Sequence, residues 1–432
     1  MLKLIHWVIV ATYIVLPAAA LAYAVAQFAR KQRGTLGNLI TTFIAALALG
    51  AAMSLVYAAA LGGRVVISQV LIAGYFAAGM LLLLKGFDAA VRFALRQVLR
   101  VPNRQALRQP PEPLSRWVMA RAAVASLLRV AVVATIGLPY VMSSVMTYRP
   151  KVHPRETPQT QLGFPFERVT FRSTDGVDLV GWWVPALAPP RNQRQGAVRA
   201  DWGQSTVIVC HGLAASKSNQ LLMARQLVPA GYNVLAFDFR AHGESGGQLS
   251  TFGKLEVNDV LGAVRWVRAN RAQKAQKIFG VGASMGGSAL IAAAADDSDE
   301  GRAIGAVATY AAYDSLDGLT ESVTRNYFVR PLPWLLRNIG VPLASAQTGA
   351  DLRDFNPADR AADLWPRPLL LIHGALDSII PFEHARILYN RASQPKYYLW
   401  IESGEHNDVL TSEGAARVVL RFFDTARPAP VI

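Results

Sequence analysis

Cysteine is nearly absent from this sequence, with Cys210 the only one among 432 residues. The chain can therefore form no internal disulfide bond, and it cannot by itself supply the ligands of a zinc finger or an iron–sulfur cluster. Cysteine content thus neither requires nor excludes an oxidising compartment. Internal repeats and low-complexity segments are also lacking, so nothing in the sequence indicates a repeat array.

Acidic residues are scarce in the first third of the chain. Up to Lys151 there are 16 Lys and Arg but only 2 acidic residues, Asp88 and Glu112. The remainder carries 44 − 16 = 28 basic and 29 − 2 = 27 acidic residues, so nearly all of the net charge of +15 lies in the first third. A basic excess confined to a hydrophobic region is typical of membrane flanks and not of a nucleic-acid-binding face. We therefore expect no nucleic-acid partner.

The same third contains four long apolar stretches. They cover residues 4–28, 36–61, 65–84 and about 122–146. Each reaches the roughly 20 residues that a helix needs to cross a bilayer. The fourth contains Arg129 and Pro139, so three spans are the alternative to four. We predict an all-α transmembrane region over residues 1–148, with the lipid bilayer as its partner.

A basic connector over residues 85–121 separates the third and fourth stretches and fixes the expected orientation. It holds eight Lys and Arg residues, and its first part has the pattern of either an interfacial helix or a solvated basic helix. The positive-inside rule places it in the cytoplasm, so four spans leave the C-terminal region extracytoplasmic. A cleaved signal peptide ending near Ala22 would put the connector outside and is rejected. We expect an integral protein of a bacterial cytoplasmic membrane, although three spans would reverse this orientation.

After a proline-rich linker, residues 149–165, the pattern changes to alternating strands and helices. Eight short apolar runs are predicted strands: Glu167–Ser173, Val177–Pro185, Ser205–Cys210, Tyr232–Phe239, Lys277–Val281, Ala303–Ala312, Pro368–Ile372 and Lys396–Glu402. Predicted helices are Lys217–Ala230, Leu255–Asn270, Ser284–Ala295, Phe382–Ala392 and Ser412–Asp424. We therefore predict an α/β domain over residues 166–425, with a mostly parallel eight-stranded sheet and helices on both faces. An insertion at about 314–359 interrupts the alternation.

The fifth strand leads into the sequence Gly282-Ala283-Ser284-Met285-Gly286, a strand–G-x-S-x-G–helix unit that predicts Ser284 as a nucleophile. The sequence does not match a dinucleotide-binding loop, because that fingerprint requires glycine at the position of Met285. The chain order that accompanies this motif, nucleophile then acid then base, selects His406 after the last strand as the base. Asp377 after the seventh strand is the favoured acid, and Asp408 is its rival. The backbone N–H groups of Leu213 and Met285 are the predicted oxyanion donors.

Motifs in several loops carry a family resemblance. They are Thr174-Asp175-Gly176-Val177, Gly181-Trp182-Trp183, Cys210-His211-Gly212, Asp238-Phe239-Arg240-Ala241-His242-Gly243-Glu244-Ser245, the segment Gly282–Gly287, Ile372-His373-Gly374 with Asp377 and Ile380-Pro381, and Gly404 with His406. With them, residues from about 164 to 425 resemble an α/β-hydrolase of the branch that contains serine aminopeptidase-like and monoglyceride-lipase-like enzymes. Ala241 departs from the glycine of many relatives. The resemblance implies a Ser284, Asp377, His406 triad with no metal and no organic cofactor, and it does not cover the first 150 residues.

We therefore expect a membrane-anchored serine hydrolase that cleaves an acyl ester, thioester or amide of a small-molecule or lipid-like substrate through an acyl-enzyme. Two alternatives stay open: a non-catalytic or regulatory module on a functional membrane region, and acyl transfer to an acceptor other than water. The sequence leaves the substrate-binding residues unknown, because the pocket depends on the insertion. The insertion contains aromatic and leucine residues such as Trp334 and Leu335, which predict that it forms a cap over the site. A more specific hypothesis is that this cap is a membrane-facing lid that binds acyl chains.

Overall fold

The computed structural model describes residues 156–188, 201–327 and 332–426, together with residues 135, 139, 140, 143, 147, 148, 151 and 153. The first three predicted membrane spans, the basic connector 85–121, most of the fourth span and part of the linker lie outside the described residues. Among the residues described, no helix has the length and apolar character needed to cross a bilayer. The compact unit treated below comprises Met142–Asn326 and Leu332–Ile432.

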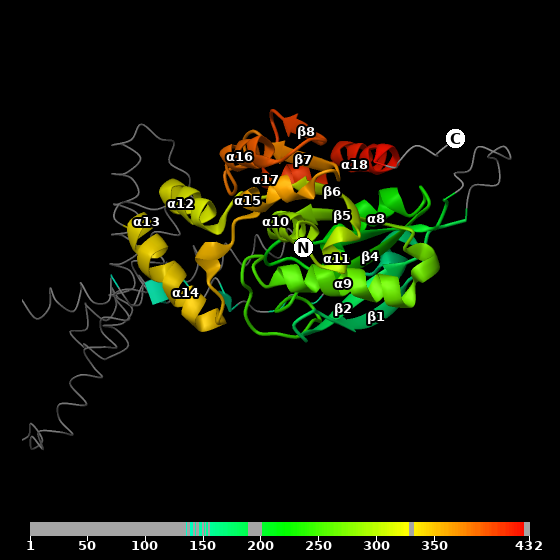
Figure 1. Cartoon of the computed structure of the whole chain (residues 1–432), viewed down its shortest axis with the longest axis horizontal. Helices are drawn as coiled ribbons and strands as arrows, with labels where there is room; N and C mark the ends of the chain where they lie inside the picture. Colours follow the sequence, from blue (N-terminus) through cyan, green and yellow to red (C-terminus); the bar gives the residue numbers. More distant parts are fainter. Residues whose placement is uncertain are drawn as a thin grey trace, which may run out of the picture. The chain divides into compact units, whose positions relative to one another are not determined.

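A single eight-stranded sheet forms the centre of this unit (Figure 1). Its strands are β1 (Glu167–Arg172), β2 (Asp178–Val184), β3 (Ser205–Cys210), β4 (Tyr232–Asp238), β5 (Lys277–Ala283), β6 (Ile304–Tyr310), β7 (Leu369–Gly374) and β8 (Lys396–Ile401). Their spatial order is β1-β2-β4-β3-β5-β6-β7-β8. Strand β2 pairs antiparallel with both β1 and β4, and every other pair is parallel. The predicted mostly parallel eight-stranded sheet is confirmed.

Side chains of the central strands are buried on both faces of the sheet, which explains why these strands are continuous apolar runs. In β3, Val207 and Val209 belong to one hydrophobic cluster, and Ile208 and Cys210 belong to the other. This alternation follows from the two-residue period of a strand. All four side chains are fully buried.

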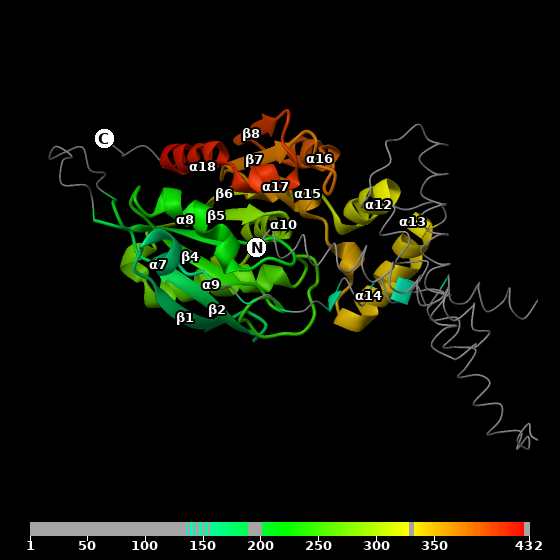
Figure 2. The same ribbon diagram turned by 180° about the vertical axis from the view of Figure 1, so that it is seen from behind.

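Two helical layers complete these clusters. Helices α9 (Glu256–Asn270) and α10 (Met285–Ala294) contribute to the cluster that contains Ile208 and Cys210, whereas α8 (Leu221–Leu227) and α18 (Glu413–Thr425) contribute to the cluster that contains Val207 and Val209. Figures 1 and 2 view these layers from opposite sides. The predicted helices over these segments are present with ends shifted by at most four residues, as is α16 (Glu383–Arg391).

The remaining elements are short or belong to the insertion. The short ones are α7 (Pro158–Leu162), η4 (Lys217–Gln220), η5 (Ala272–Lys274), α11 (Asp299–Arg302) and α17 (His406–Thr411). The insertion, called the cap below, comprises α12 (Leu316–Tyr327), α13 (Leu332–Leu335), the π-helix η6 (Leu336–Gly340), α14 (Val341–Thr348), η7 (Leu352–Asp354), α15 (Pro357–Arg360) and η8 (Ala361–Leu364). Helices α12 to α14 stand beyond one end of the sheet in both views (Figures 1 and 2).

The chain upstream of the linker is hydrogen bonded to the unit that contains the sheet. Thr147 is fully buried, and its carbonyl oxygen accepts from the Ser250 N–H at 2.9 Å. The Thr147 hydroxyl donates to the Ser143 carbonyl at 2.8 Å. Ser250 Oγ in turn donates to Glu256 Oε1 at 2.9 Å and lies 3.7 Å from Met285 Sδ. Thr147 is therefore linked through one residue to the start of α10.

Candidate active site

Ser284 lies in a strained turn between β5 and α10. Its backbone has φ 53° and ψ −120°, a conformation that side chains other than glycine rarely adopt. The Ser284 N–H donates to the Tyr310 carbonyl at 2.7 Å, which ties the turn to the end of β6. The side chain is partly exposed, while Met285 beside it is buried. The strain is thus held by the surrounding sheet and leaves the hydroxyl accessible.

Two close backbone approaches explain the glycines that flank the serine. A Cβ atom on Gly282 would lie 2.5 Å from the Gly286 carbonyl oxygen. A Cβ atom on Gly286 would lie 2.4 Å from the carbonyl oxygen of His211, at the end of β3. Both distances are well inside van der Waals contact, so the G-x-S-x-G spacing reflects packing of α10 against two strand ends.

The turn after β3 lies against Ser284. A Cβ atom on Gly212 would be 3.3 Å from Ser284 Cβ. The Ala214 N–H donates to His242 Nε2 at 3.2 Å and is thereby occupied. Among the described residues, the N–H groups of Leu213 and Met285 have no protein acceptor. These are the two donors predicted from the sequence, and both flank the position of the serine.

His406 and Asp377 form a buried pair. His406 Nδ1 lies 2.7 Å from Asp377 Oδ2, and the Asp377 side chain is fully buried. The other oxygen, Asp377 Oδ1, accepts from the N–H groups of Ile379 at 2.9 Å and Ile380 at 2.8 Å. These two bonds fix the carboxylate, which therefore orients the imidazole and leaves Nε2 as its other functional nitrogen.

The rival acid, Asp408, lies in a different setting. Its side chain is exposed, and its Oδ2 accepts from the Glu405 N–H at 3.2 Å, across the start of α17. The structure thus brings Asp377 to His406 and places Asp408 at a helix N-terminus. In the described part of the chain, Ser284 Oγ has no hydrogen-bond partner. The described residues therefore show the histidine–aspartate bond of the predicted triad but no serine–histidine bond.

Three further histidines shape this end of the sheet. His373 Nε2 donates to the Ile380 carbonyl at 2.8 Å, and burial lowers its pKa. His211 accepts from the Phe239 N–H through Nε2 at 3.0 Å, while its Nδ1 lies 2.7 Å from the Gly212 oxygen. Burial, aided by the neighbouring His242, lowers the pKa of His211 to about 3. His211 is therefore uncharged, and its hydrogen bonds stabilise the turn that carries Leu213.

The Asp238–Ser245 motif holds the neighbouring loop through buried ion pairs. Lys217, fully buried, contacts Asp238 and also reaches Glu244 at 2.6 Å. Asp238 Oδ1 accepts from the Lys217 N–H at 2.7 Å, and Asp238 Oδ2 accepts from the Glu244 N–H at 2.9 Å. Arg240 similarly joins Asp175 and Asp259. Sequence reasoning missed Lys217, because no motif or spacing distinguishes it from a surface lysine.

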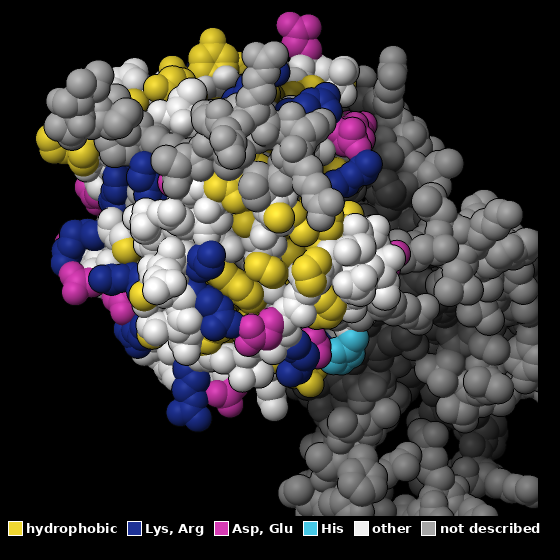
Figure 3. All heavy atoms as spheres, turned by 90° about the vertical axis from the view of Figure 1, so that its right-hand side faces the viewer, with side chains coloured by type: hydrophobic (Ala, Val, Ile, Leu, Met, Phe, Trp, Pro, Cys, Tyr) yellow, Lys and Arg dark blue, Asp and Glu magenta, His cyan; other side chains and the backbone are white. Residues whose placement is uncertain are grey.

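Ala241, the departure from the family pattern, adopts φ 60°. This left-handed conformation is the one that glycine enters without a Cβ penalty. On the face drawn in Figure 3, Lys and Arg side chains lie beside Asp and Glu side chains, around a central group of hydrophobic side chains. Within the described ranges, no group of three or more His, Cys, Asp or Glu side chains could hold a metal ion.

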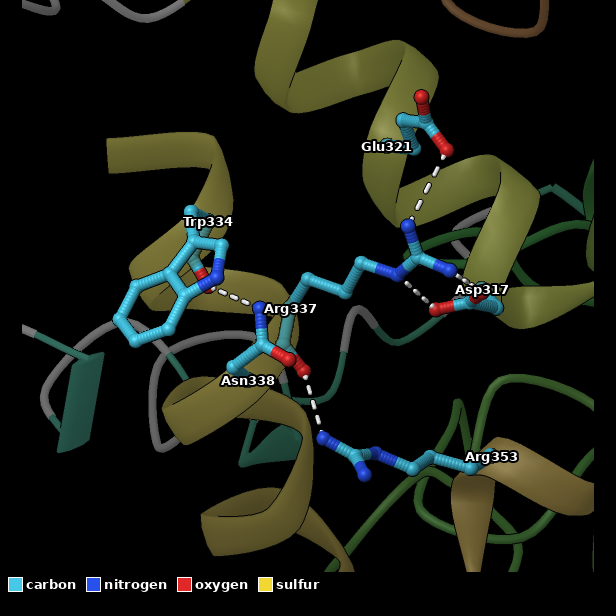
Figure 4. Close-up of a pocket in the computed structure, with 6 residues that line it drawn as sticks. All are labelled: Asp317, Glu321, Trp334, Arg337, Asn338 and Arg353. Carbon is cyan, nitrogen blue, oxygen red and sulfur yellow. Dashed lines mark hydrogen bonds and ion pairs between the residues drawn. The ribbon is translucent and has the colours of Figure 1, made fainter. Parts of the chain in front are cut away.

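A separate cavity of about 560 Å³ lies in the cap (Figure 4). Its lining residues are Asp317, Glu321, Trp334, Arg337, Asn338 and Arg353. Arg337 pairs with Asp317 and with Glu321, and Arg353 donates to the Arg337 carbonyl at 3.1 Å. Trp334 is 62% exposed, but Leu335, which was expected beside it on a lid surface, is buried. None of the predicted triad or oxyanion residues lines this cavity.

Comparison with known proteins identifies the family to which this fold belongs. Residues 203–342 match the family model described as "Serine aminopeptidase, S33". The uncharacterized protein YfhR of Escherichia coli O157:H7 is 30% identical over 246 residues, which cover 57% of this chain and 75% of that protein. The chain belongs to the α/β-hydrolase family.

Two further relatives extend the comparison. The uncharacterized protein YqkD of Bacillus subtilis is 30% identical over 203 residues, 47% of this chain and 65% of YqkD. Among solved structures, the Pyrococcus furiosus esterase Pf2001 is similar with a TM-score of 0.50 and 27% identity, covering 64% of this chain and 98% of the esterase. This α/β-hydrolase thus shares its fold with a protein described as an esterase.

The buried neutral His211 predicts acid sensitivity of the fold. Its folded pKa lies below the ordinary value of 6.5, so the unfolded state binds an additional proton as the pH falls below 6.5. This residue alone should lower the free energy of unfolding by about 1.4 kcal/mol per pH unit between 6.5 and about 3. Urea unfolding of wild type and His211→Gln between pH 7 and 5 should give a shallower pH dependence for the variant. Equal slopes would contradict this.

Proposed function

We propose that this α/β-hydrolase is a membrane-anchored serine hydrolase that cleaves an acyl ester, thioester or amide through a covalent acyl-enzyme. The proposal rests chiefly on one observation, the 2.7 Å contact between His406 Nδ1 and the buried Asp377 carboxylate, at the sheet end where the strained Ser284 turn also lies. The printed description of Pf2001 as an esterase favours an ester substrate.

In the proposed reaction, Ser284 Oγ attacks the acyl carbonyl carbon while His406 Nε2 accepts the hydroxyl proton. Asp377 holds the other ring nitrogen and stabilises the imidazolium that forms. The developing oxyanion accepts hydrogen bonds from the N–H groups of Leu213 and Met285. Collapse of the tetrahedral intermediate expels the alcohol, thiol or amine, which takes the proton from His406.

Water then completes the cycle. It attacks the acyl carbonyl of the ester on Ser284 and passes a proton to His406 Nε2. The second intermediate collapses, the acid leaves, and His406 returns its proton to Ser284 Oγ. No organic cofactor is required for these steps.

The N-terminal region supports membrane anchoring in this proposal. Its long apolar stretches, with a basic connector between the third and fourth, have the pattern of membrane-spanning helices with positive cytoplasmic loops. Four spans place Ser284 on the extracytoplasmic side, where it acts on small-molecule or lipid-like acyl substrates.

Replacing Ser284 should abolish covalent labelling. We expect a fluorophosphonate probe to label the wild-type chain and to leave Ser284→Ala unlabelled, because the alanine has no oxygen to phosphonylate. The labelled peptide, identified by mass spectrometry, should contain residue 284. Undiminished labelling of Ser284→Ala, with its thermal unfolding unchanged, would refute the assignment of the nucleophile.

The two candidate acids provide a matched comparison. Asp377→Asn should lower kcat for a p-nitrophenyl ester by roughly 1,000- to 10,000-fold, since an amide favours the wrong imidazole tautomer. Asp408→Asn makes the same chemical change at the exposed start of α17 and should alter kcat by less than about threefold. The reverse ranking would make Asp408 the catalytic acid.

Orientation can be tested on the full chain in its membrane. With four spans, protease added to bacterial spheroplasts should digest the hydrolase domain, whereas inside-out vesicles should protect it. Alkaline carbonate should leave the chain in the membrane pellet. Digestion only in the inside-out vesicles would indicate an odd number of spans, and extraction by carbonate would exclude an integral protein.

A further inference from the structure

A second serine–histidine–aspartate series lies outside the proposed active site. Ser322 Oγ is 2.9 Å from His384 Nε2, and His384 Nδ1 is 2.5 Å from Asp314 Oδ1. All three residues are buried, with exposures of 5%, 4% and 8% for Ser322, His384 and Asp314. The Asp314–His384–Ser322 series is thus continuous, and the proposed reaction does not use it.

Its burial and backbone setting exclude a second nucleophile at Ser322. The residue lies within α12 and not at a strand–helix turn, and its hydroxyl is also 3.1 Å from the Leu319 carbonyl. A serine buried in this way leaves no room for an acyl carbonyl. The series therefore positions other parts of the molecule.

The three residues come from three parts of the chain that meet near the proposed site. Asp314 follows β6, whose last residue Tyr310 accepts the Ser284 N–H. Ser322 belongs to α12, the first cap helix. His384 is the second residue of α16, and its N–H donates to the Pro381 carbonyl, next to the Ile380 whose N–H holds Asp377. His384 is therefore connected to the acid loop on one side and to the cap on the other.

Other hydroxyls on α12 make bonds within the helix. Thr320 donates to the Leu316 carbonyl at 2.8 Å, and Thr324 donates to the Thr320 carbonyl at 2.5 Å. Thr324 is as buried as Ser322, with 4% exposed. Ser322 differs from both because its hydroxyl reaches a different helix.

We propose that the Asp314–His384–Ser322 series fixes the position of cap helix α12 relative to the acid loop and thereby determines how large an acyl group the site accepts. Ser322 and His384 are positioning residues in this proposal, which rests on the proposed serine hydrolase activity. The physical basis is that these hydrogen bonds are buried, so removing one partner leaves the others unsatisfied. Loss of the Ser322 hydroxyl would therefore release α12 from His384.

The test compares two hydroxyl deletions on one helix. Ser322→Ala removes the bond to His384, whereas Thr324→Val removes a hydroxyl bonded only to its own helix. We expect Ser322→Ala to change the ratio of kcat/KM for p-nitrophenyl octanoate to that for p-nitrophenyl acetate by about fivefold, mainly through the KM of the octanoate. Thr324→Val should leave this ratio within twofold, and Ser322→Thr should restore it.

The outcomes separate this proposal from the proposed function. An unchanged ratio in Ser322→Ala, or an equal change in Thr324→Val, overturns the positioning role while fluorophosphonate labelling of Ser284 stands. If the wild-type chain neither takes the probe nor cleaves either ester, the proposed function fails. Amide hydrogen exchange then tests directly whether the Ser322–His384 bond holds α12 in position. Faster exchange in α12 of Ser322→Ala than of Thr324→Val supports the positioning role, and equal rates overturn it.

Discussion

The close approach of α10 to the ends of β3 and β5 is the constraint on which the rest of the site depends. Gly286 passes so near the His211 carbonyl, and Gly282 so near the Gly286 carbonyl, that no side chain fits at either position. Ser284 is forced into a conformation with positive φ, and the turn carrying Leu213 is held beside it. These close packing contacts therefore determine the backbone conformation at Ser284, the predicted nucleophile, and the surroundings of the predicted oxyanion donors together.

Much of this could be predicted from the sequence, because it depends on local patterns. The bounds of β3 agree to the residue, since continuous apolar runs bounded by turns determine buried strands. The predicted acid and base follow strand ends, and residues at the carboxyl edge of neighbouring parallel strands come together whatever their separation in sequence. As this rule predicts, His406 and Asp377 are in contact although they are 29 residues apart in the sequence.

Interactions between distant loops could not be predicted in this way. Lys217 is among the residue types least often buried, and only the fold brings it to Asp238 and Glu244. The Asp314–His384–Ser322 series joins a strand end to two helices, and no spacing rule links them. The cap shows the same limit, since its sequence indicated an insertion but not that Leu335 would be buried and Trp334 exposed.

The Thr147 contact bears on where the hydrolase unit begins. Its carbonyl supplies the acceptor for the Ser250 N–H in a buried setting. A fragment cut within the proline-rich linker would leave that donor without its partner, at a cost of about 1–3 kcal/mol. Ser250 Oγ also lies 3.7 Å from Met285 Sδ, so the lost bond would be one residue away from the Ser284 turn. A stable fragment should therefore keep the last residues that precede the linker, and the proposed anchor and the α/β unit share that short stretch of chain.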